Sequence, residues 1–152
     1  DCRLSGTTAT LLLDRRLPTG SRELCVAHCG DSRAVLAYRA EEGSAALTAM
    51  DLTMDHKPGL EEERARIVAA GGVVRRHQGD PNDRIFLPNM LCPGLAMSRS
   101  LGDTMAHSVG ASCEPEVTVH AVRPSWRFVL VCSDGVWEFI TSQEAVDFVA
   151  RF

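Results

Sequence analysis

Three acidic residues stand where they could bind a metal ion. Asp31 follows the apolar run "LCVAHCG", Asp134 follows "RFVLVCS", and Glu138 comes four residues after Asp134. In a helical turn, residues four apart face the same way. If the two apolar runs are neighbouring strands, three carboxylates meet at one edge of a sheet and repel one another unless a cation neutralises them. Oxygen ligands suit Mg²⁺ or Mn²⁺, and such an ion turns bound water into a nucleophile at neutral pH.

Each of these acids also has a purely structural explanation. Asp31, in "CGDSR", is a typical hairpin-turn residue, and Asp134 is suited to cap the turn that follows it. Glu138 is explained equally well as a solvated surface charge. Because acids at strand ends are common turn chemistry, spacing alone favours the structural explanations.

The rest of the pattern predicts an α+β fold with helices laid on antiparallel sheets. Apolar and β-branched runs predict strands at 7–14, 24–30, 32–40, 43–50, 73–78, 116–122 and 127–133. The first four, at roughly 8–12 residues per strand, resemble an antiparallel meander. The period changes to helical in 55–72, with Pro58 near the start and Gly71 at the end. A second helix is predicted in 141–152, where Thr141 and Glu144 form a capping box and an apolar stripe includes Phe148 and Val149. The proline- and glycine-rich stretch 79–94 predicts an irregular loop.

Composition narrows the class of protein. The 152 residues suit one domain, and a net charge of −4 without a basic block argues against nucleic-acid binding. No apolar run approaches the ~20 residues of a membrane span. The six cysteines form no CxxC pair, and Cys25, His28 and Cys29 lack a second ligand pair for zinc. We therefore expect reduced thiols, in the cytosol or the nucleus.

Seven motifs in order resemble one family, the protein phosphatase 2C family of metal-dependent protein Ser/Thr phosphatases. They run over essentially the whole chain, and they are "SGTTAT", "CGDSRAVL", "LTMDHKP", "ERARIVAAGGVV", "GLAMSRSLGD", "EPEV" and "CSDGVWEFITSQEAVDFV". Any one of them is a weak signal, but seven at plausible spacing are a strong one.

The resemblance implies an α-β-β-α sandwich of two antiparallel sheets flanked by helices, with a two-metal site at one end. It implies hydrolysis of phosphoserine and phosphothreonine in protein substrates, using Mg²⁺ or Mn²⁺, by a domain that is monomeric. It makes Asp134 a ligand of a core metal, with Gly135 permitting a tight exit from the strand. It associates Asp31 and Glu138 with a further, weaker metal.

Other residues have weaker cases. Arg84, in "DRIFLP", resembles an arginine near the family's flap that meets the substrate, and a solvated loop arginine explains it equally well. Thr8 would hydrogen-bond near the metals, or it is simply a β-branched strand residue. Arg99 and Asp103, four apart, are expected to form a structural ion pair. Trp137 is expected to pack in the core.

The sequence also departs from the family pattern. Glu138 stands where the family usually has aspartate, so its reach toward the weaker metal differs by one methylene. No "DGHGG", no upstream phosphate-gripping arginine and no late "DN" occur, so no residue is assigned as catalytic. We therefore expect residues 1–152 to be the middle part of a phosphatase domain, incomplete in this chain. The alternative is a non-catalytic pseudophosphatase or binding module that keeps the sandwich and docks through its flap.

Overall fold

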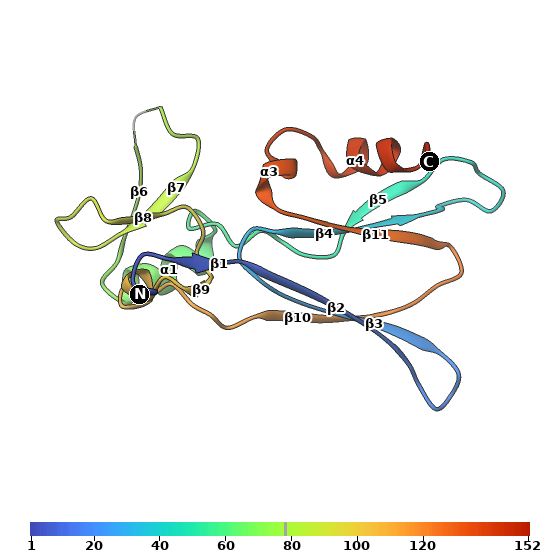
Figure 1. Ribbon diagram of the computed structural model, residues 1–152, viewed down its shortest axis with the longest axis horizontal. Coiled ribbons are helices and arrows are strands. Elements are labelled where there is room, and N and C mark those ends of the chain that lie inside the picture. Colours follow the sequence, from blue (N-terminus) through green and yellow to red (C-terminus); the bar gives the residue numbers. More distant parts are fainter. Residues whose placement is uncertain (78) are drawn as a thin grey trace. The chain divides into compact units, whose positions relative to one another are not determined.

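The computed structural model describes residues 1–77 and 79–152, and Figure 1 labels most of its elements. The chain forms two compact units. The first unit comprises Asp1–Ala9, Cys29–Asp31 and Asp55–Pro115. The second comprises Thr10–His28, Ser32–Met54 and Glu116–Phe152.

Two three-stranded sheets build the second unit. One has the order β10-β3-β2, from Glu116–Ala121, Arg22–Cys29 and Ala9–Arg16; the other has the order β11-β4-β5, from Trp126–Cys132, Arg33–Tyr38 and Thr48–Asp51. The β10–β3, β11–β4 and β4–β5 pairings are antiparallel. The predicted strands are thus present, although the fourth begins at Thr48 rather than at Gly43.

Strand β4 is the centre of this unit because both of its faces are buried. Ala34 and Leu36 pack in one apolar cluster with Leu24 and Val26 of β3. The alternate residues, Val35 and Ala37, pack in another cluster with Val146. This alternation produces three layers: the first sheet, the second sheet and a helix on its far side.

That helix, α4 (Ser142–Val149), begins at the predicted capping box. The Thr141 hydroxyl accepts from the Glu144 N–H, and the Glu144 carboxylate accepts from the Thr141 N–H at 2.7 Å. The predicted apolar stripe is only partly buried, because Val146 is fully enclosed whereas Phe148 is 58% exposed.

The first unit contains small sheets and two helices. Its elements are β1 (Gly6–Thr7) paired with β9 (Leu101–Gly102), the sheet β6-β7-β8 (Val73–Arg76, Asp83–Phe86 and Pro93–Leu95), α1 (Glu61–Ala69) and α2 (Thr104–His107). Gln78, the last residue of one predicted strand, lies outside the described residues.

Two local predictions in this unit are wrong. The expected irregular loop at 79–94 contains β7, whose Ile85 and Phe86 are fully buried; these two residues outweigh the flanking turn formers. Helix α1 begins at Glu61, not near Pro58, and Pro58 itself is fully buried. Three glutamates then occupy the first helical turn, where the helix dipole favours negative charge.

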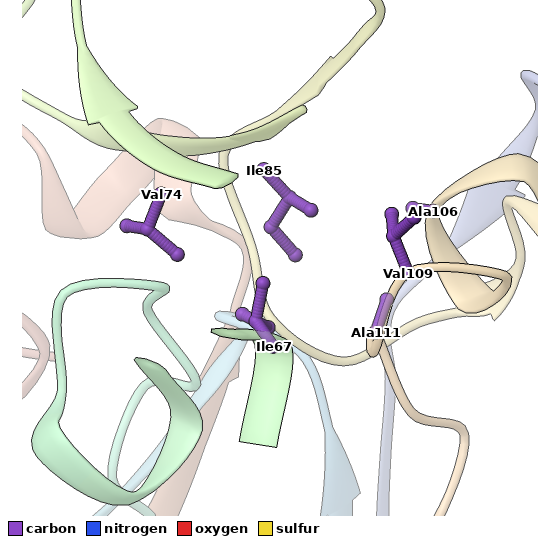
Figure 2. Close-up of a cluster of buried hydrophobic side chains, with 6 residues drawn as sticks. All are labelled: Ile67, Val74, Ile85, Ala106, Val109 and Ala111. Carbon is purple, nitrogen blue, oxygen red and sulfur yellow. The ribbon is translucent and has the colours of Figure 1, made fainter. Parts of the chain in front are cut away.

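A single apolar cluster holds these elements together. Figure 2 shows side chains of α1, β6, β7 and the α2 region converging on one another: Ile67, Val74, Ile85, Ala106, Val109 and Ala111. Among the described residues, no helix is both long and apolar enough to cross a membrane.

Candidate metal centre

Asp31 lies two residues after the end of β3 and is almost completely buried. The preceding residue, Gly30, has a φ of +110°, a conformation that side-chain-bearing residues rarely adopt. A Cβ on Gly30 would also come within 2.3 Å of the Thr8 methyl carbon. Thr8 therefore packs against the backbone that carries Asp31, and its hydrogen-bonding role near a metal stays a prediction.

The loop 55–58 clamps this backbone from the other side. The Gly30 N–H donates to His56 Nδ1 at 3.1 Å, and the His56 N–H donates to the Gly30 carbonyl at 3.0 Å. The next residues along each segment, Asp31 and Lys57, consequently face each other. Lys57 Nζ donates to Asp31 Oδ2 at 2.5 Å, so a cation already neutralises this carboxylate.

Lys57 was missed in the sequence, although a signal was present. Lys57 lies in "LTMDHKP", which was interpreted as a family motif and as a helix start but not as the source of an ion pair, and it is the single lysine in the chain. A residue that is unique in type was a reason to look for a specific partner.

Asp134 and Glu138 lie in the second unit, where Asp134 is the first residue of the short helix α3 (Asp134–Trp137) and Glu138 is its C-cap. The Glu138 N–H donates to the Asp134 carbonyl at 2.9 Å, so the two residues are one helical turn apart, as predicted. Both side chains are exposed. Trp137 packs against the core and its Nε1–H donates to the Cys132 carbonyl at 2.8 Å, which anchors α3 to the end of β11.

Gly135 does not have the role that was expected for it. Its backbone is outside the left-handed region, and an added Cβ would meet only Ser133 Oγ, at an ordinary 3.5 Å. The strand exit therefore does not require glycine at this position. The Gly135 N–H instead donates to Asp134 Oδ1 at 2.9 Å and orients that carboxylate.

Each of the three predicted ligands, taken by itself, suits a hard divalent cation. Asp31, Asp134 and Glu138 offer carboxylate oxygens only, which are the ligands that Mg²⁺ and Mn²⁺ prefer. Asp31 belongs to the first unit and the other two to the second, and within the first unit the Asp31 oxygen already accepts a positively charged group.

Arg84 lies on β7 and is already engaged within its own unit. Its Nε donates to Asp80 Oδ2 at 2.6 Å, which lowers the pKa of the Asp80 carboxyl, and its Nη1 donates to the Gly94 carbonyl at 2.8 Å. Arg84 therefore bridges the two ends of the segment 80–94, and its contact with a substrate stays a prediction.

A second buried carboxylate, Glu63, was not anticipated. Arg66 donates to both of its oxygens, at 2.7 and 2.9 Å, Arg99 donates at 2.7 Å, and Ser98 Oγ at 2.5 Å. Burial alone would raise the pKa of Glu63, but these hydrogen bonds outweigh it and hold the pKa well below its usual range. The expected pairing of Arg99 with Asp103 is wrong, because strand β9 separates the two residues and Arg99 turns to Glu63.

Comparisons with known proteins agree on one family. The rice (Oryza sativa subsp. japonica) protein "Probable protein phosphatase 2C 12" is 42% identical over 150 residues, which are 98% of this chain and 37% of that protein. "Probable protein phosphatase 2C 18" of Arabidopsis thaliana is 41% identical over 151 residues, 99% of this chain and 29% of that protein. The chain thus spans about a third of the length of these relatives.

Solved structures confirm the expected fold class. The crystal structure of serine-threonine phosphatase 2C from Toxoplasma gondii matches with a TM-score of 0.71 at 28% identity, over 84% of this chain and 43% of that chain. The family model described as "Protein phosphatase 2C" matches residues 1–152. Together with the ordered motifs, these matches establish that the chain belongs to the protein phosphatase 2C family.

Proposed function

We propose that residues 1–152 are part of the catalytic domain of a metal-dependent protein serine/threonine phosphatase. The observation that carries the proposal is the family match along all 152 residues, in a chain that retains carboxylates at the ends of β3 and β11. The reaction is hydrolysis of phosphoserine and phosphothreonine in protein substrates.

Asp134 is the proposed ligand of a core Mg²⁺ or Mn²⁺, and Asp31 and Glu138 serve a weaker ion. When bound, a divalent ion supplies a nucleophilic water and offsets the charge of the phosphate. The protein itself orients the Asp134 carboxylate. The Gly135 N–H holds one oxygen of Asp134, and the Trp137–Cys132 hydrogen bond holds the helix that carries it.

Arg84 is the proposed substrate contact. Its Nε and Nη1 hold Asp80 and Gly94, so a phosphate would bind through Nη2 or replace Asp80. A phosphate accepts charge-assisted hydrogen bonds from a guanidinium in the same planar geometry as a carboxylate, which makes Asp80 a natural competitor.

We also propose a cellular location for the protein. All six cysteines lie among the described residues and are free thiols, which is consistent with the cytosol or the nucleus. We expect phosphorylated proteins as the partners and a monomeric domain.

The test is metal-dependent release of phosphate by the full-length protein. We expect turnover of a phosphothreonine peptide with Mn²⁺ or Mg²⁺, loss of turnover with a chelator, and recovery when metal is returned. A phosphotyrosine peptide of the same sequence is the matched control. A folded full-length protein that binds phosphopeptides without hydrolysing them would support the non-catalytic binding module instead.

A further inference from the structure

The Asp31 carboxylate and the Lys57 ammonium form an unequal pair. The Asp31 side chain is 3% exposed, whereas the Lys57 side chain is 31% exposed. The carboxylate therefore has little access to water, while the ammonium can reach solvent by a rotation of its four-carbon stem. One partner of the pair is fixed and the other can leave.

The position of Lys57 is determined by its neighbours on both sides. His56 makes two hydrogen bonds to Gly30, and its carbonyl accepts from the Ser98 N–H at 2.8 Å. Pro58, the next residue, is fully buried. Because these contacts fix the backbone at 56 and 58, the Lys57 side chain starts close to Asp31 whenever this unit is folded.

The residue type suits an exchangeable cation. Lys57 is the only lysine among the 16 lysine and arginine residues of the sequence. An ammonium is a compact, strongly hydrated point charge, and it makes a single contact to one carboxylate oxygen here. Glu63, by contrast, is held by two arginines through bonds to both of its oxygens. Arginine can bind a carboxylate through two parallel hydrogen bonds. Lys57 instead places one positive charge at the position that a metal ion would take and makes one hydrogen bond there.

We propose that Lys57 is a built-in competitor of the divalent ion at Asp31, so that this ion binds only by displacing the ammonium into water. The inference rests on the proposed function, since it takes Asp31 as a metal ligand. It adds a reason why the ion at Asp31 is held weakly: its affinity is reduced by the free energy of the Asp31–Lys57 pair. Lys57 acts as a positioning residue, because it touches the ligand and not the substrate.

The first test is a Mn²⁺ titration of the full-length protein, followed by electron paramagnetic resonance of free Mn²⁺. Wild type is compared with Lys57→Met, which keeps the stem length and removes the charge, and with Lys57→Arg, which keeps the charge. We expect Lys57→Met to tighten the weakest class of Mn²⁺ sites by at least about tenfold, because a unit charge beside the ligand is removed. Lys57→Arg should give no tightening.

The variant Asp31→Asn tests the assignment of Asp31 as a metal ligand separately from the competitor role of Lys57. If Asp31→Asn leaves every class of Mn²⁺ site unchanged, Asp31 is not a ligand and its proposed assignment fails. If Asp31→Asn abolishes the weakest class but Lys57→Met does not tighten it, Asp31 is a ligand and the competitor role of Lys57 is wrong.

A second test uses the wild-type protein, so that it does not depend on the folding of a variant. The acetylation rate of Lys57 by a water-soluble acylating reagent is followed by mass spectrometry of the tryptic peptide 40–64, which trypsin leaves intact at the Lys57–Pro58 bond. We expect Lys57 to react several-fold faster once Mn²⁺ saturates the weakest sites. In Asp31→Asn the rate should be high with or without Mn²⁺. An unchanged rate in wild type at a Mn²⁺ concentration shown to fill those sites would overturn the proposal.

Discussion

Asp31 and Asp134 share a proposed role but have opposite surroundings. Asp31 is buried, at the end of a strand, beside a lysine that comes from a segment 26 residues away. Asp134 is exposed on a one-turn helix, and its carboxylate bonds to the N–H of the next residue. A buried carboxylate must be neutralised as soon as the chain folds, whereas an exposed one can remain charged and hydrated.

Glu63 extends this comparison to a carboxylate with no proposed metal. It is as deeply buried as Asp31, but Arg66, Arg99 and Ser98 satisfy both of its oxygens. The three acids therefore form a series from permanently paired, through exchangeably paired, to solvated. The predictions below test that order, from the largest expected effect to the smallest.

Replacing Glu63 should have the largest effect on stability. Glu63→Gln leaves Arg66 and Arg99 without their shared counter-ion, and we expect the free energy of unfolding to fall by about 3 kcal/mol. Urea unfolding of the full-length protein measures this change. Glu61→Gln, on the exposed first turn of the same helix, is the matched control and should cost about 0.5 kcal/mol or less. Equal effects at 61 and 63 would show that the network contributes nothing specific.

Low pH should weaken the stabilising contribution of Glu63 and its arginine partners. The pKa of Glu63 in the folded state lies below its ordinary value of 4.5. Its contribution to stability is therefore complete above that value and is lost as the pH falls through the folded-state pKa. We expect wild type to lose more stability than Glu63→Gln when unfolding is compared at pH 5 and at about pH 3. Parallel losses in the two proteins would show that other carboxylates govern acid unfolding.

Removing the charge of Asp134 should damage activity without damaging the fold. An amide oxygen is a weaker ligand than a carboxylate, so Asp134→Asn should lower turnover by at least about 100-fold, with partial rescue at high Mn²⁺. Because the side chain is exposed, the circular dichroism spectrum and the melting temperature should barely change. Near-normal turnover would mean that Asp134 is only a turn residue.

The Asp31–Lys57 pair should respond asymmetrically when metal is absent. Lys57→Met strands a buried carboxylate and should cost about 1–3 kcal/mol, whereas Asp31→Asn releases a lysine that reaches water and should cost less. The double variant should recover part of the Lys57→Met loss, as a double-mutant cycle in a chelator-containing buffer will show. Strictly additive losses would mean that the two side chains do not interact.

Glu138 should matter least. Its side chain is exposed and its proposed ion is the weaker one, so Glu138→Gln should reduce turnover only a few-fold and leave stability within about 0.5 kcal/mol. Steady-state rates across a Mn²⁺ series provide the comparison with Asp134→Asn. A loss as large as that of Asp134→Asn would place Glu138 among the core ligands.

The sequence by itself determined the features that depend on neighbouring residues. The strands β3, β4, β10 and β11 follow their apolar runs, and α4 begins where Thr141 and Glu144 form the capping box. These signals are local, because side-chain alternation and caps act within a few residues. The family was also recognisable, because its motifs are short segments that keep their order along the chain.

Only the tertiary structure decided which charges are paired and which apolar faces are covered. Lys57 and Asp31 are 26 residues apart and Arg99 and Glu63 are 36 apart, so no helical or strand period predicts either pair. The same holds for β7, where burial of Ile85 and Phe86 outweighed the surrounding turn formers, and for Phe148, which looked like a core residue and is exposed. Burial and ion pairing are set by segments that meet in space, and the free energy of placing a charge or an apolar side chain depends on those partners rather than on its neighbours in sequence.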